Sequence, residues 1–230
     1  FGRFYILYGW IWLPILRKGV KKMEEELDTK MMMTELIGSL AVVYFAARFA
    51  MPGSPTMYSA MAAGLVLAVM MMTFTGAMIL PWITIGKMAN GDITWQNGAL
   101  AFAMQMLGAV LAWTINMWSA GMLDHAEHMW SVGTMDVQAG AMTLIGGFLL
   151  MIVYERLSGD SLGNAAVGIF VWMLAAAGLS VVNAGDVGGM LITSGWTGDN
   201  MIMIFGSMII GGVGATAALM FGDMILGEEE

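Results

Sequence analysis

Both histidines of the chain stand in one short polar segment, Asp124-His125-Ala126-Glu127-His128. On one helical turn His125 and His128 share a face, and Asp124 precedes His128 by four positions. Imidazole and carboxylate groups are ligands of divalent metal ions, so Asp124, His125 and His128 form a candidate metal site in a loop. The spacing supplies too few ligands for a closed site without help from elsewhere, and the alternative is a solvated polar loop.

Other arrangements of reactive residues are missing from the sequence. It contains no nucleotide-binding loop, no hydrolase nucleophile elbow and no zinc-protease helix. The absence of cysteine excludes disulfides, thiolate metal sites and cysteine nucleophiles. The net charge of −8 arises partly from a C-terminal run of glutamates, and no basic patch would bind nucleic acid. We therefore expect no enzymatic activity, no cofactor and no nucleic-acid partner.

The composition is that of a protein embedded in lipid. Of the 230 residues, 59% are apolar and 11% are charged, against about 45–50% and about 25% in soluble domains. A water-soluble core cannot absorb so much apolar surface, whereas a bilayer can. The 27 methionines fill irregular gaps and the 31 glycines let helices approach closely. These features predict an all-α integral membrane protein with tightly packed helices.

Six apolar stretches are each near the length of a tilted spanning helix. We expect spanning helices at residues 33–50, 57–74, 98–118, 137–154, 165–182 and 201–221. Two further apolar pieces follow the second and fifth of these stretches, at residues 79–88 and 183–193. They are about half as long as a span, which makes them candidates for re-entrant half-helices.

The first 30 residues differ from the rest of the chain. Residues 1–16 are rich in aromatic side chains and are interrupted by Pro14, and a basic stretch follows at residues 17–22. This pattern is typical of an interfacial amphipathic helix that lies beside anionic lipid. We interpret residues 1–30 as an interfacial segment with a polar connector, and residues 31–230 as one transmembrane domain. The aromatic segment is also a candidate docking site for a protein partner.

The basic residues predict the orientation in the membrane. With six crossings and an internal N-terminus, every Lys and Arg except Arg48 falls on the inner side. Lys and Arg concentrate on the cytoplasmic side of short loops. We therefore expect both termini in the cytoplasm, and we expect the membrane to be the cell membrane.

Three short matches suggest an internal repeat. Residues 35–38 (Glu-Leu-Ile-Gly) are matched by residues 143–146 (Thr-Leu-Ile-Gly), 108 positions later. Leu80 corresponds in position to Asn183, and Gly108 corresponds to Gly211, both 103 positions later. Because a unit of three crossings is odd, the second copy must enter the membrane upside down, and the interrupted helices then meet near the midplane. The predicted repeats span about 33–118 and 137–226; chance similarity between Gly-rich helices is the alternative.

The order and spacing of these residues resemble the aquaporin, or major intrinsic protein, family over about residues 33–226. Glu35-Leu36-Ile37-Gly38 resembles the acidic signature of the first helix. Residues 75–84 (Thr-Gly-Ala-Met-Ile-Leu-Pro-Trp-Ile-Thr) align without a gap with the family's Ser-Gly-Ala-His-x-Asn-Pro-Ala-Val-Thr. Gln105 and Gly108-Ala109 match the Gln-x-x-Gly-Ala of the third helix, and residues 183–189 take the place of the second Asn-Pro-Ala-Arg box.

This resemblance implies six spanning helices, two half-helices that meet at the pore centre, a tetramer, and passive conduction of water or small uncharged solutes. It implies that Glu35 and Gln105 are structural polar residues behind the half-helices. Ala60 or Ala63 would line the filter from the second helix. The implied pore and selectivity residues are Leu80, Pro81, Trp82, Val171, Ser180, Asn183, Ala184, Gly185 and Asp186.

Four departures from the family bear most directly on the pore. Leu80 replaces an Asn and offers no hydrogen-bond donor to a solute, while Ala184 replaces a Pro. Trp82 replaces a small Ala, so its indole would either push the half-helices apart or fill the pore. Asp186 replaces the filter Arg. Its carboxylate could reverse the local charge and admit or bind a cation. It could also satisfy first-turn amides and complement the dipole of a half-helix whose N-cap is Asn183, and the two roles are compatible.

Three hypotheses follow from the sequence. The first is an aquaporin-like passive channel for water or a small uncharged solute, embedded in lipid as a homotetramer. The second is a non-conducting structural or accessory subunit of a membrane complex that retains the fold. The third is a metal-binding membrane component that uses the outer loop with the two histidines.

Overall fold

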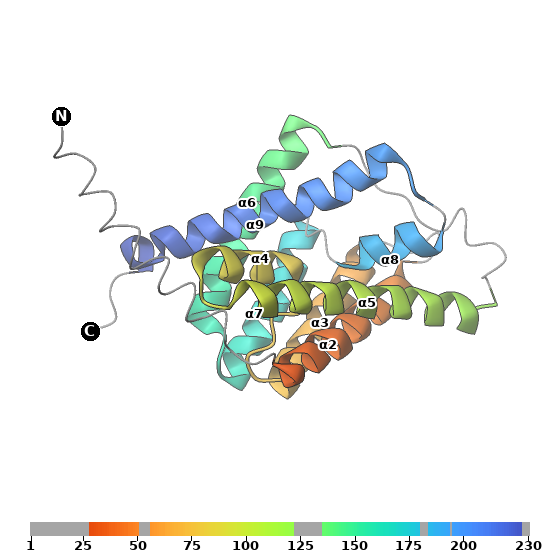
Figure 1. Cartoon of the computed structure of the whole chain (residues 1–230), viewed down its shortest axis with the longest axis horizontal. Coiled ribbons are helices and arrows are strands. Elements are labelled where there is room, and N and C mark those ends of the chain that lie inside the picture. Colours follow the sequence, from red (N-terminus) through yellow and green to blue (C-terminus); the bar gives the residue numbers. More distant parts are fainter. Residues whose placement is uncertain (1–27, 51–55, 122–134, 180–183, 194, 227–230) are drawn as a thin grey trace, which may run out of the picture.

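The computed structural model describes residues 28–50, 56–121, 135–179, 184–193 and 195–226 (Figure 1). Within these ranges every regular element is a helix, which confirms the all-α prediction. The helices are, in chain order, α2 (Thr29–Phe49), α3 (Thr56–Thr73), α4 (Pro81–Asn90), α5 (Trp95–Ser119), α6 (Val137–Leu157), α7 (Ser161–Ala176), α8 (Ala184–Ile192) and α9 (Gly198–Leu226).

Each apolar stretch of the sequence coincides with one of these helices. Four of them, α2, α5, α6 and α9, are long and apolar enough to cross a membrane. The helices α3 and α7 are apolar but shorter, and α7 ends at Ala176, whereas the sequence predicted a helix to residue 182. The two short pieces form α4, with ten residues, and α8, with nine.

Several helix starts carry a cap that the sequence makes recognisable. A side-chain oxygen of the capping residue accepts a hydrogen bond from the backbone N–H three positions later, which satisfies one of the free donors of the first turn. The capping residues are Asp28, Thr94, Asp136 and Asp160. The helix α4 begins differently, with Pro81 in its first turn, where the missing N–H of proline is not needed.

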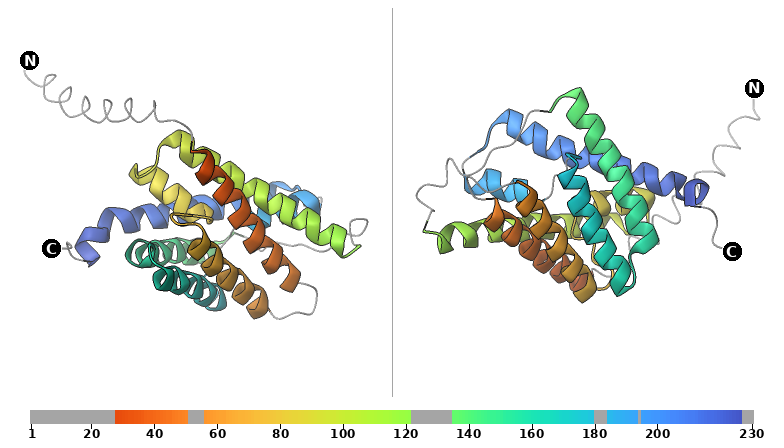
Figure 2. Two further views of the ribbon diagram at one scale, coloured as in Figure 1. Left: turned by 90° about the horizontal axis from the view of Figure 1, so that it is seen from below. Right: turned by 180° about the vertical axis from the view of Figure 1, so that it is seen from behind.

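The helices pack in matched pairs, as Figures 1 and 2 show. Helix α2 lies along α5 as α6 lies along α9, and α3 packs against α7. Each short helix packs against the long helix of the other half of the chain, α4 on α9 and α8 on α5. Glycines allow the closest approaches, because a Cβ at Gly147 of α6 would collide with the backbone of Gly211 of α9.

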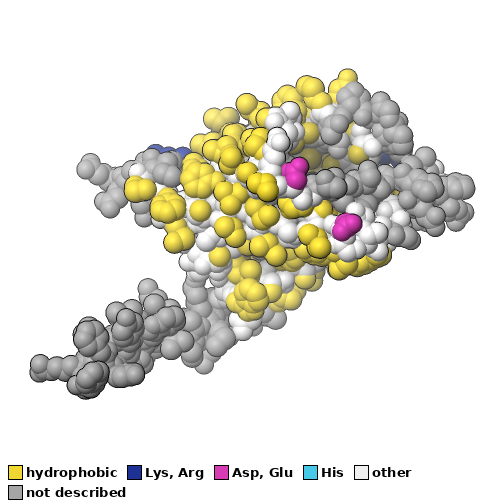
Figure 3. Space-filling view, turned by 90° about the horizontal axis from the view of Figure 1, so that it is seen from above, with side chains coloured by type: hydrophobic (Ala, Val, Ile, Leu, Met, Phe, Trp, Pro, Cys, Tyr) yellow, Lys and Arg dark blue, Asp and Glu magenta, His cyan; other side chains and the backbone are white. Residues whose placement is uncertain are grey.

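The outer surface of the bundle is largely apolar over the face drawn in Figure 3. Large apolar side chains, among them Leu65, Ile145 and Ile209, are exposed on the surface of the described bundle. Trp95 and Trp118, at the two ends of α5, are 71% and 72% exposed. They lie about 35 Å apart along the helix at about 1.5 Å per residue, which places both near the boundaries of a bilayer core about 30 Å thick. The protein is an integral membrane protein.

Candidate functional site

The chain segment before α4 is held by one buried carboxylate. Both oxygens of Glu35 in α2 accept hydrogen bonds from the backbone, from Met78 N at 2.7 Å and from Ile79 N at 2.6 Å. The Gln105 side chain of α5 donates to Glu35 at 2.6 Å and to Thr84 of α4 at 2.8 Å. Glu35 and Gln105 are fully buried, so these contacts connect three helices behind the start of α4.

This network fixes an unusual turn. Ile79 adopts a φ of 61°, in the left-handed region that β-branched residues rarely enter and that costs on the order of 1–3 kcal/mol. Its side chain lies against Gly38 of α2, where a Cβ would collide with it. The bond from Ile79 N to Glu35 and this packing hold the turn in place. The turn positions Leu80 immediately before the first residue of α4.

The start of α8 is held by α5 instead. The indole nitrogen of Trp113 donates a hydrogen bond to the carbonyl of Gly185 at 2.8 Å. Gly188 lies against the backbone of Ala109 and the ring of Trp113, so that α8 packs closely on α5. Asp186 lies in the first turn of α8 and is partly exposed.

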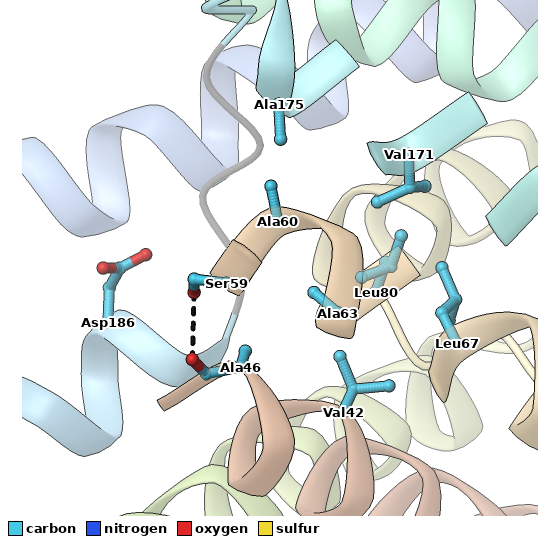
Figure 4. Close-up of a pocket in the computed structure, with 10 residues that line it drawn as sticks. All are labelled: Val42, Ala46, Ser59, Ala60, Ala63, Leu67, Leu80, Val171, Ala175 and Asp186. Atoms are coloured by element: carbon cyan, nitrogen blue, oxygen red, sulfur yellow. Dashed lines mark hydrogen bonds between the residues drawn. The ribbon is translucent and has the colours of Figure 1, made fainter. Parts of the chain in front are cut away.

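A pocket of about 280 Å³ lies between the starts of the two short helices and three of the longer ones (Figure 4). The helices α2, α3 and α7 each contribute residues spaced by about one turn, so one face of each helix forms the wall. Leu80 and Asp186 contribute from the starts of α4 and α8. The lining residues are Val42, Ala46, Ser59, Ala60, Ala63, Leu67, Leu80, Val171, Ala175 and Asp186.

The pocket changes in polarity from one side to the other. In Figure 4, Asp186 lies on one side near Ser59, whose hydroxyl donates to the carbonyl of Ala46 at 2.9 Å. Leu80, Val171 and Leu67 lie on the other side and are buried. These three belong to a larger apolar cluster that continues along α3 and α7. The pocket therefore has a polar group on one side and an apolar wall on the other.

The fold is similar to that of a known channel protein, although the sequence is not. No family model and no curated protein matches the sequence. The structure of the aquaglyceroporin from Plasmodium falciparum superposes with a TM-score of 0.71 over 86% of this chain and 96% of that chain, at 16% sequence identity. This chain has the aquaporin fold. At that identity the likeness establishes the fold alone.

The aquaporin fold brings several of the sequence-derived site residues together. Leu80, Val171 and Asp186 line the same pocket, and Ala60 and Ala63 both do so. Pro81 is buried in the first turn of α4, and Ala184 and Gly185 are buried at the start of α8, outside the set that lines the pocket. The remaining site residues lie outside the described residues: Ser180, Asn183, Asp124, His125 and His128.

Trp82 lies in the first turn of α4, as the sequence predicted, but it does not line the pocket. Its indole is 1% exposed. The ring fits against Gly211 of α9, where a Cβ would overlap it, and its far edge lies near Gly146 of α6. The sequence left two alternatives, an indole that fills the pore or one that pushes the half-helices apart. The indole does not fill this pocket, because glycines on two neighbouring helices make room for it elsewhere.

Five residues that line the pocket were not predicted from the sequence. Two of them could have been predicted from their spacing. Leu67 follows Ala63 by four positions and Ala175 follows Val171 by four, so each lies on the same helix face as a residue already assigned to the filter. The α2 residues had no such reference point in the alignment. The missed residues are Val42, Ala46, Ser59, Leu67 and Ala175.

Proposed function

We propose that the protein is a passive channel for water or a small uncharged solute, and that the solute passes through the pocket between α2, α3 and α7. One observation carries this proposal: the starts of both short helices, at Leu80 and Asp186, line the same pocket. In membrane proteins with interrupted helices, solute sites lie where the half-helix ends meet. The aquaporin fold, shared with an aquaglyceroporin, supports the same reading.

The lining favours a small neutral solute. The volume of about 280 Å³ is near the lower end of the range for ligand pockets, roughly 300–1,000 Å³. Most of the lining side chains are Ala, Val or Leu, which give a wide and weakly polar passage. A charged solute would have to shed its hydration against Leu67 and Leu80, and burial of an unpaired charge is costly.

We further propose the membrane arrangement that the sequence predicted. Six crossings, formed by two inverted units at about 33–118 and 137–226, would place both short helices within the membrane, with both termini in the cytoplasm. The packing supports this arrangement, because the pair α2 and α5 is matched by α6 and α9 and each short helix crosses to the other half. A homotetramer in the cell membrane, with residues 1–30 at the interface and available to a protein partner, completes the proposal.

Reconstituted vesicles test the channel. Vesicles that contain the protein should shrink faster than empty vesicles after an osmotic jump with an impermeant solute. Ala63→Trp fills the pocket from α3 and should return the rate to that of empty vesicles. Leu65→Trp is the matched control, because Leu65 is on the same helix, is 49% exposed and does not line the pocket. Equal rates for the two variants would contradict a path through this pocket.

A non-conducting subunit is the second candidate. The apolar wall formed by Leu67 and Leu80 favours it. Leu80 takes the place of an Asn in the aligned family and therefore offers a solute no amide donor. In that case wild-type vesicles shrink no faster than empty ones, and Leu80→Asn, which supplies a donor, raises the rate. The hypothesis of a metal-binding component concerns residues outside the described ranges and stays a prediction, to be tested by calorimetric metal titration of His128→Ala.

A further inference from the structure

We infer that a plug of four buried side chains closes the path beyond the pocket and sets both the rate and the largest solute of the proposed channel. The four side chains are those of Met71, Met78, Met151 and Val167. The plug lies on the path of the proposed function, on which this inference rests. The pocket itself does not restrict the path, since the predicted filter positions Ala63 and Val171 line open space.

The pocket occupies only one end of the helices that form it. Ser59 lies in the first turn of α3, and Ala175 is one residue before the end of α7. The lining of α3 runs from Ser59 to Leu67, about 12 Å, whereas the 18 residues of α3 span about 27 Å at about 1.5 Å per residue. A solute in the pocket must therefore pass along the rest of α3, beyond Leu67, to reach the other end of the bundle.

The faces of α3 and α7 that line the pocket continue directly into the plug. Met71 follows Leu67 by four positions and Val167 precedes Val171 by four. Each therefore lies one turn further along the same helix face. Beside them, the Asn164 side chain of α7 donates a hydrogen bond to the carbonyl of Met71 at 3.0 Å. This bond joins the two helices at the level of the plug, where the pocket has ended.

The other two methionines come from two further elements. Met78 lies in the turn two residues before Leu80, and Met151 belongs to α6. Both are members of the apolar cluster that contains Leu67, Leu80 and Val171 of the pocket. The four plug residues are each at most 2% exposed. A side chain that water cannot touch has no water-filled passage beside it, so the path is closed at this level.

Methionine suits a plug that has to yield. Its side chain is unbranched, has three rotatable bonds and adapts to irregular spaces. The backbone near two of the methionines is held, because Met78 N donates to Glu35 at 2.7 Å and the carbonyl of Met71 accepts from Asn164. A solute therefore passes when methionine side chains rotate, with the helices in place. Such a rotation makes room for a small neutral solute, and a strongly hydrated one loses more hydrogen bonds at the apolar plug.

Osmotic shrinkage of vesicles that contain the full chain tests the plug. Met71→Ala removes most of one plug side chain and should raise the rate for water at least about fivefold, because the barrier enters the rate exponentially. It should raise the permeability to xylitol, a bulky neutral solute, by a larger factor. Met72→Ala is the matched control: the same truncation at the next residue of α3, which is 42% exposed and does not line the pocket, should change neither.

Two further variants separate an opened plug from a damaged protein. Met71→Ile keeps the volume but is stiff at its branched Cβ, so it should lower the rate below that of the wild type. Ala63→Trp added to Met71→Ala should return the rate to that of empty vesicles, which excludes a leak around the protein. Met151→Ala opens the plug from α6 and should give the same increase as Met71→Ala. Circular dichroism and gel filtration in detergent check that each variant is folded.

The outcomes distinguish the plug from the channel. Folded Met71→Ala and Met151→Ala proteins that conduct no faster than the wild type would overturn the inference, as would an equal increase in Met72→Ala. If the wild type conducts nothing and the two plug variants conduct, the channel proposal fails for the wild type and the plug remains. If the wild type conducts, Ala63→Trp blocks it and the plug variants change nothing, the plug fails and the channel remains.

Discussion

The two short helices are seated in the bundle in opposite ways. On α4 the large side chain belongs to the short helix: Trp82 fits against Gly211 of α9, which has no side chain there. On α8 the large side chain belongs to the long helix: Trp113 of α5 fits against Gly188 of α8. Each junction thus combines an indole with a glycine, with the roles reversed. The fold requires complementary volumes at these junctions, and either partner can supply the large side chain.

The junctions also differ in how their polar groups are satisfied. The indole nitrogen of Trp113 has an acceptor in Gly185, whereas that of Trp82 is buried with no hydrogen-bond partner among the described residues. The start of α4 is instead held by the carboxylate of Glu35. Thr143, which the proposed repeat would match with Glu35, donates to the carbonyl of Ala139 in its own helix. Packing and a carboxylate therefore hold α4, and an indole hydrogen bond with close packing holds α8.

Of the variants that test this comparison, Trp82→Ala should cause the largest loss of folding free energy. It removes a fully buried indole between α4, α6 and α9, and such truncations typically cost about 3–5 kcal/mol of folding free energy. Denaturant or thermal unfolding in detergent measures the loss. Trp118→Ala is the control, because Trp118 is 72% exposed and its removal should cost less than about 1 kcal/mol. An equally small effect at both positions would show that the indole of Trp82 is not a structural part of the junction.

The same residue marks the limit of prediction from the sequence. The sequence predicted Trp82 at the start of a half-helix, and the residue lies in the first turn of α4. From a small residue at this position in the aligned family, the sequence led to the inference that the indole either fills the pore or pushes the half-helices apart. That inference needed the direction of the side chain and the identity of the facing residue. Gly211 lies 129 positions later in the chain, and no local pattern links it to Trp82. The length of the apolar segments predicted where α4 and α9 lie in the chain, but not that an indole of one packs against a glycine of the other.

Glu35→Gln should cause the second largest loss of folding free energy. The amide oxygen can replace one acceptor, but the amide nitrogen then faces a backbone donor, so Met78 N or Ile79 N is left without a partner in a buried site. A buried unsatisfied group costs about 1–3 kcal/mol. The matched variant Thr143→Val removes a hydroxyl bonded within its own helix and should cost less. If the two variants lose the same stability, the carboxylate is not what distinguishes the two halves.

The fold was more predictable than the site because it depends on patterns within short segments. Apolar length located every described helix, and Pro81 marked the start of α4. The pocket depends on which faces of α2, α3 and α7 turn inward, and these helices are apolar on most sides, so their sequences carry little directional signal. Leu80, Val171 and Asp186 were found by alignment to a family pattern. Val42 and Ala46 required the three-dimensional packing.

The smallest expected quantity is the difference in unfolding free energy between Trp113→Phe and Trp82→Phe. Trp113→Phe keeps most of the ring against Gly188 and removes the hydrogen bond to Gly185, which is worth about 0.5–1.5 kcal/mol. Trp82→Phe removes the same atoms from the other junction but loses no hydrogen bond, since that indole nitrogen has no partner among the described residues. The lost volume is common to both variants, so the difference between their unfolding free energies isolates the bond. Trp113→Phe should be the more destabilised of the two, and the reverse order would mean that the indole nitrogen of Trp82 has a partner, such as a buried water, that contributes more than Gly185 does.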